Sequence, residues 1–112
     1  MQTLASQTQL DYVRTACLKN RASMGASAVA NLRCWRAHES ILRGAIIAHI
    51  DNKRKIFCKP DPQNGNQHLF NHLHANVTLF EGKTIYVEMV IMERQMIILF
   101  AHEHTTFNKL PQ

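Results

Sequence analysis

The hydrophobic pattern of the first fifty residues has helical spacing. Leu10, Val13 and Cys17 recur three to four positions apart, and Thr8 and Asp11 before and within the first turn are typical of a helix start. This pattern predicts a first helix over about residues 9–20, followed by a connection through residues 21–26.

A second apolar stripe predicts a longer helix that begins at Ser27 and ends near Asp51. Gly44 falls inside this stretch and costs about 1 kcal/mol relative to alanine in a helix interior, so two shorter helices are an open alternative. The residues of the stripe are Val29, Leu32, Trp35, Leu42, Ile46 and Ile50.

A loop is expected next, over residues 53–66, because Pro60, Pro62 and Gly65 break any periodic pattern. Asn66 is then expected to begin a short helix, whose apolar side would carry Leu69, Phe70 and Leu73.

The C-terminal segment fits two structures. Its apolar residues repeat at intervals of 4, 3, 4 and 3, which indicates a helix, while alternation over 84–92 and 96–103 would fit a β-hairpin. The hairpin would turn at Glu93, Arg94 and Gln95, none of which is a typical turn residue, and this favours the helix. The repeating residues are Ile85, Met89, Met92, Met96 and Leu99.

The predicted fold class is therefore mainly α: a small helical bundle of about four helices with one long basic loop. A length of 112 residues and 46% hydrophobic residues predict a single domain over residues 1–112. No apolar run is long enough to span a membrane. No signal peptide is recognisable after Met1.

Charge is distributed unevenly along the chain. Residues 1–60 hold ten Lys or Arg against three acidic residues, a net +7, whereas residues 61–112 hold three against five, a net −2. The basic half predicts an anionic partner, which could be nucleic acid, an acidic protein or a lipid headgroup.

Three cysteines, Cys17, Cys34 and Cys58, have no metal-ligand spacing, and an odd number cannot all pair within the chain. One disulfide with one unpaired thiol, or three buried thiols, are the alternatives. His68 and His72 could share a zinc ion with His74 or with His102 and His104, but the sequence holds neither a His-Glu-x-x-His motif nor a nearby cysteine. We therefore expect no metal, no cofactor, no catalytic residue and no enzyme activity.

A resemblance to a known family covers residues 44–100. Residues 44–51 resemble a Gly-aromatic-Ile-x-Gly-Val-x-Asp helix, and residues 57–60 resemble a Phe-Cys-x-Pro motif. Gln67, Glu81 and residues 90–93 fall where that family has a glutamine, a glutamate and a closing helix. These motifs are similar to those of the Rap/Tai-like immunity proteins, which neutralise amidase toxins of type VI secretion. The family's terminal Phe-Pro-Cys is absent here.

The resemblance implies a periplasmic, helical and often dimeric protein without catalytic activity, which blocks a cognate cell-wall amidase with a protruding loop. In that oxidising compartment we expect one disulfide, with Cys17 and Cys34 as the preferred pair because their helices would be adjacent. The alternatives are a small basic nucleic-acid-binding or regulatory protein, or an α+β interaction or chaperone protein. The expected partner-binding residues are Lys53, Arg54, Lys55, Lys59, Asp61, Gln63 and Asn64.

Overall fold

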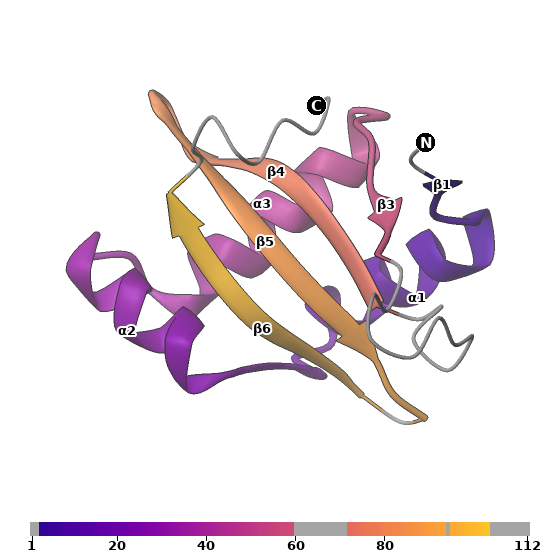
Figure 1. Ribbon diagram of the computed structural model, residues 1–112, viewed down its shortest axis with the longest axis horizontal. Helices are drawn as coiled ribbons and strands as arrows, with labels where there is room; N and C mark the ends of the chain where they lie inside the picture. The colour runs from indigo at the N-terminus through magenta and orange to yellow at the C-terminus, as the bar shows by residue number, and fades with distance from the viewer. Residues whose placement is uncertain (1–2, 60–71, 94, 104–112) are drawn as a thin grey trace.

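The computed structural model describes residues 3–59, 72–93 and 95–103. The order of its elements is β1, α1, β2, α2, α3, β3, β4, β5 and β6 (Figure 1). The helices are α1 (Gln7–Leu18), α2 (Ala26–Cys34) and α3 (Glu39–Asp51). The strands are β1 (Thr3–Leu4), β2 (Ala22–Met24), β3 (Phe57–Cys58), β4 (His72–Phe80), β5 (Lys83–Ile91) and β6 (Met96–Glu103).

The described strands form one mixed sheet in the order β1-β3-β4-β5-β6-β2. Neighbouring strands are antiparallel except β2 and β6, which are parallel. The long strands β4 and β5 pair from His72 with Val90 to Phe80 with Lys83. Because β2 pairs with β6, the chain leaves α1, crosses to the far edge of the sheet and only then begins α2.

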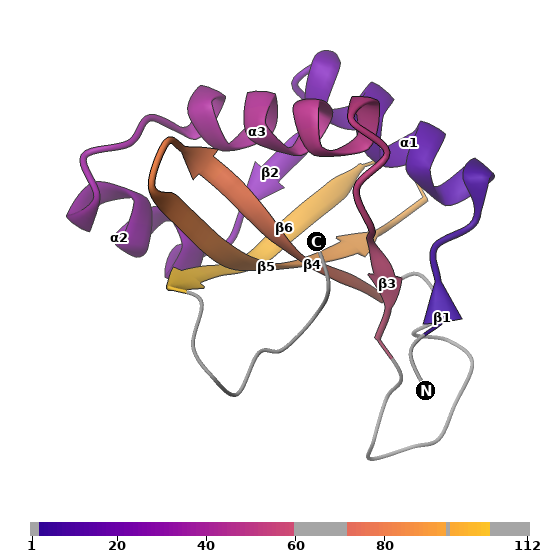
Figure 2. The same ribbon diagram turned by 90° about the horizontal axis from the view of Figure 1, so that it is seen from above.

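The helices cover one face of the sheet (Figure 2), where α3 packs on β4, α1 packs on α3, and α2 lies against β6. The apolar core fills the space between these layers. Its largest fully buried apolar side chains are Leu32, Leu42, Ile46, Leu73, Ile85, Met89, Met96 and Ile98.

Each helix is followed by a left-handed residue that is not glycine: Asn20, Arg36 or Lys53. After α2, the Arg36 amide donates to the Arg33 carbonyl and the Ala37 amide to the Leu32 carbonyl, which is a Schellman motif. The two-helix alternative for residues 27–51 is therefore the observed one. The break falls at Trp35–His38 rather than at Gly44, and it carries no glycine that the sequence pattern could have revealed.

The prediction of a mainly α, helical bundle fold is wrong, because the structure is α+β with a mixed sheet. Residues 83–103 form the hairpin of β5 and β6. Its turn lacks glycine, but the Met92 amide donates to the Gln95 carbonyl over 2.8 Å, and the Tyr12 hydroxyl of α1 donates to the Met92 carbonyl over 2.9 Å. A contact from a distant helix thus holds a turn whose own residues do not favour one.

The first predicted helix corresponds to α1, which begins two residues earlier than expected. Ser6, rather than Thr8, caps α1 and forms a capping box with Gln9. The short helix predicted from Asn66 lies largely outside the described residues, and Leu73 at its expected end belongs to β4.

The predicted disulfide between Cys17 and Cys34 is also wrong, because all three cysteines are unpaired thiols. The helices that carry them are not adjacent as expected, because β2 lies between α1 and α2 in the chain. Strand β2 pairs with β6, so α2 begins at that edge of the sheet. Cys17 is buried in the core, and this burial raises the pKa of its thiol to about 12, whereas Cys34 is exposed.

Thiol titration tests this arrangement. In the native protein we expect Cys34 to react rapidly and Cys17 to stay unreactive, because only a thiolate attacks the reagent and Cys17 is both buried and protonated. In denaturant without reductant, all three cysteines should react. A count of one thiol in denaturant would contradict the structure.

Candidate functional site on the uncovered sheet face

The two faces of the sheet differ in chemistry because successive side chains of a strand point to opposite faces. In β5, Ile85, Val87 and Met89 face the helices within the core, while Tyr86 and Glu88 point to the other face. No described helix covers that second face (Figure 2). Nevertheless, Tyr86 and Glu88 are each only 6% exposed, so this face holds buried polar groups.

Five side chains on this face form what we call the polar cluster: Lys59, His72, His74, Tyr86 and Glu88. The sheet register brings them together, because His74 of β4 pairs with Glu88 of β5. Lys59 follows β3, and its amide donates to the His72 carbonyl over 2.6 Å, which places its side chain beside β4.

Hydrogen bonds connect the cluster in a chain. His74 Nδ1 lies 2.8 Å from the Tyr86 hydroxyl oxygen, and that hydroxyl donates to Glu88 Oε1 over 2.8 Å. The Lys59 ammonium pairs with Glu88 Oε1, and His72 Nε2 lies 3.5 Å from Glu88 Oε2. A single carboxylate therefore connects groups from the end of β3, from β4 and from β5.

The charges in the cluster follow from these contacts. Burial alone would raise the pKa of Glu88, but hydrogen bonds from His72, Lys59 and Tyr86 outweigh it and lower that pKa to about 2. Burial, and then the charge of Lys59, lower the pKa of His74 to about 4. Burial and the hydrogen bond to Glu88 raise the pKa of Tyr86. At neutral pH, Glu88 is ionised while His74 and Tyr86 are neutral.

These protonation states determine the tautomer of His74. An ionised carboxylate can only accept, so the single Tyr86 proton goes to Glu88, and the Tyr86 oxygen must accept from His74 Nδ1–H. The lone pair of His74 is then on Nε2. That atom is buried and has no hydrogen-bond partner among the described residues, in a side chain that is 8% exposed. The cluster therefore presents an unsatisfied acceptor.

Aromatic rings extend the cluster across the sheet. Phe57 of β3 meets His74 edge to face at 6.5 Å between centroids, and His74 meets Tyr86 in the same way at 5.7 Å. His102 of β6 lies 4.9 Å from Tyr86. The row fixes the orientation of each ring and leaves His74 little rotational freedom.

The residues predicted to bind a partner separate into three groups. Lys59 belongs to the polar cluster, whereas Lys53, Arg54 and Lys55 are exposed on the connection between α3 and β3. Asp61, Gln63 and Asn64 lie outside the described residues. The sequence-based search considered His72, His74 and His102 only as zinc ligands, and it missed Tyr86 and Glu88. The alternation of polar and apolar residues in 84–89 was the signal that could have found them.

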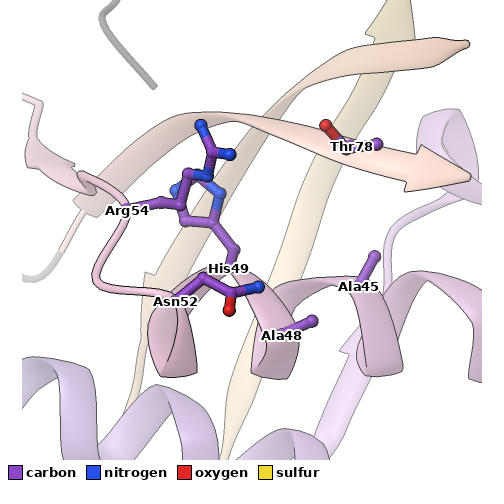
Figure 3. Close-up of a pocket in the computed structure, with 6 residues that line it drawn as sticks. All are labelled: Ala45, Ala48, His49, Asn52, Arg54 and Thr78. Atoms are coloured by element: carbon purple, nitrogen blue, oxygen red, sulfur yellow. The ribbon is translucent and has the colours of Figure 1, made fainter. Parts of the chain in front are cut away.

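A separate cavity of about 310 Å³ lies between α3 and β4 and is lined in part by His49, Asn52, Arg54 and Thr78 (Figure 3). His49 is buried, and its Nε2 lies 2.8 Å from the Lys55 carbonyl oxygen. Burial lowers the pKa of His49, so at neutral pH it donates to Lys55 as a neutral ring. This side chain holds the connection after α3 in place.

Comparison with protein-family models, with curated proteins and with solved structures finds no significant match. The described residues contain no group of three or more His, Cys, Asp or Glu arranged to hold a metal ion. Among these residues, no helix combines the length and the apolar character needed to cross a membrane.

The low pKa of His74 predicts a pH-dependent stability. Between pH 6.5 and about 4 the unfolded chain binds a proton at this histidine that the folded protein does not, so the free energy of unfolding should fall as the pH is lowered. The full effect is ~3 kcal/mol. Glu88 should cause a second decrease in the free energy of unfolding as the pH falls from 4.5 towards 2, because its pKa in the folded protein is also lowered.

Urea unfolding of the parent and of His74→Gln at several pH values measures the effect. The variant should show a weaker dependence than the parent between pH 6.5 and 5, because glutamine does not titrate, while the lowered pKa of His49 leaves the same remainder in both proteins. A matched control is His38→Ser, which removes an exposed histidine while keeping a residue that can cap α3. Equal slopes for the two variants would show that His74 is not the group responsible.

Proposed function

We propose that this protein binds single-stranded RNA at the polar cluster and cleaves it by acid–base catalysis. The observation that carries the proposal is the hydrogen-bonded chain from His74 through Tyr86 to Glu88, which leaves the Nε2 lone pair of a buried histidine without a partner among the described residues. A ribose 2′-hydroxyl can donate to such an acceptor, and the proposal requires that RNA binding opens a path to Nε2, because this atom is closed to solvent in the protein without ligand.

The charge of the molecule supports an anionic ligand. The chain carries a net charge of +5, and Lys59 in the cluster keeps 32% of its side chain exposed. A phosphate that approaches from the β3 side would meet this ammonium first. Nucleic-acid binding was already an alternative on the basis of the sequence, where it rested on the cations of the loop and of the helices and on aromatic residues that could stack with bases.

RNA fits the chemistry of these side chains because its own 2′-hydroxyl is the nucleophile. In the proposed reaction His74 Nε2 accepts the 2′-hydroxyl proton, the 2′-oxygen bonds to phosphorus, and the bond from phosphorus to the 5′-oxygen breaks. The His72 ring donates the proton that the 5′-oxygen takes up. Lys59 stabilises the negative charge that develops on the phosphate. The products are a 2′,3′-cyclic phosphate and a 5′-hydroxyl end.

The pKa of His74 is consistent with a role that begins only when substrate binds. In the protein without ligand the charge of Lys59 contributes to keeping this pKa at about 4. Burial is the larger cause of the low pKa and would remain, so a phosphate bound to Lys59 would offset only the charge of Lys59 and raise the pKa of His74 in part, which makes it a better base.

This proposal differs from the expectation of a non-catalytic immunity protein. The resemblance behind that expectation implied a helical protein with a disulfide, and the structure has neither a helical fold nor a disulfide among its cysteines. Inhibition of a cell-wall amidase therefore lacks the structural support that the polar cluster gives to RNA.

A cleavage assay with a short, end-labelled single-stranded RNA tests the proposal. The parent protein should produce 2′,3′-cyclic phosphate ends, and the same sequence with 2′-O-methyl groups should stay intact because its nucleophile is blocked. His74→Gln should lower the cleavage rate by about 100-fold or more, the usual contribution of a general base.

Lys59→Ala should also lower cleavage, whereas Lys19→Ala, at an exposed lysine on the C-cap of α1, should leave the rate unchanged. The proposal fails if a folded parent protein leaves the RNA intact, or if Lys59→Ala and Lys19→Ala cleave equally well. Binding of RNA without cleavage would retain the interface and reject the catalytic roles.

A further inference from the structure

A second surface, away from the polar cluster, has the features of a protein-docking site. A groove of about 310 Å³ runs between the start of α1, the end of α3 and the segment before β3. Its apolar side chains, which we call the apolar groove, are Leu4, Leu10, Ile50 and Ile56. Leu4 is 56% exposed and lies beside the other apolar residues of the groove.

Three consecutive cations, Lys53, Arg54 and Lys55, line the same groove, and we call them the basic segment. All three are exposed. None of them forms an ion pair with a residue that the structure describes, whereas Arg14 and Arg43 on the helices are paired with Asp51 and Glu39. The groove thus combines an apolar floor with three positive charges along its rim.

The backbone of the basic segment is fixed at every residue. The Lys53 amide donates to the Ile50 carbonyl and the Arg54 amide to the His49 carbonyl, which ends α3 in a Schellman motif. His49 Nε2 holds the Lys55 carbonyl over 2.8 Å, and the Ala5 amide donates to the Ile56 carbonyl over 2.9 Å.

Lys53 itself takes a left-handed conformation, with φ of 59°, which costs a residue other than glycine conformational energy. A rim that is already ordered loses little conformational entropy when a partner binds.

We infer that the apolar groove and the basic segment bind an acidic amphipathic segment of a partner protein, in which large apolar side chains alternate with Asp or Glu. The apolar side chains of the partner would pack on Leu4 and Leu10 and bury them. The carboxylates of the partner would form ion pairs with the basic segment. Charge complementarity of this kind speeds association and orients the partner, while the apolar contacts determine how long it stays. This inference is independent of RNA cleavage, because the two sites share none of the residues named for them.

The test uses a labelled synthetic peptide of about twelve residues, in which leucine and isoleucine alternate with glutamate and aspartate, and measures its binding by fluorescence anisotropy. The double variant R54E/K55E should weaken binding at least about tenfold. The matched control K19E/R33E makes the same change in net charge at exposed residues outside the groove, and it should bind as the parent does.

A second pair of variants tests the apolar floor. Leu4→Ser should weaken the binding of the peptide. Leu18→Ser should leave it unchanged, because Leu18 is 61% exposed at the end of α1 and lies outside the groove. The inference is overturned if the peptide does not bind the parent, or if a peptide with serine in place of its apolar residues binds equally well. It is also overturned if R54E/K55E abolishes the binding of the RNA probe and leaves that of the peptide unchanged, since the groove would then serve nucleic acid.

Discussion

The buried carboxylate of Glu88 is the constraint on which the uncovered face of the sheet depends. Burying an ionised carboxylate without partners costs several kcal/mol, so the fold must bring donors to it. Tyr86, two residues away on the same strand, donates to it, the ammonium of Lys59 after β3 pairs with it, and His72 Nε2 of β4 lies 3.5 Å from its second oxygen. The charge of Glu88 therefore constrains the alignment of β3, β4 and β5 through contacts on the uncovered face. The apolar core constrains the same strands through contacts on the face that the helices cover.

The helices were easier to predict from the sequence than the strands. The spacing of Leu10, Val13 and Cys17 located α1 to within about two residues at each end, because a helix that packs on one side shows its period directly. Strand β5 is buried on both faces at its centre, and β6 has apolar residues at successive positions, so the apolar residues of these strands also fit a helical period. The Tyr12 contact that holds their turn comes from residues 80 positions away, and no local pattern can reveal it.

The candidate site was predictable only in part. Lys59 was selected for its charge among other loop residues, and His72 and His74 were noted as possible metal ligands. Their actual partners depend on the register between β4 and β5, which the sequence did not provide once residues 85–99 were taken as a helix. Recognition of the polar residues Tyr86 and Glu88 at alternate positions would have placed both on one face of a strand.

The account depends most on the protonation of His74, which NMR can measure directly. Long-range ¹⁵N correlation spectra of the histidine rings at neutral pH should show His74 as the neutral tautomer with its proton on Nδ1, and a pH titration should give a pKa of about 4. A proton on Nε2, or a pKa near the ordinary value of 6.5, would contradict the hydrogen-bonded chain and remove the unsatisfied acceptor on which the proposed function rests.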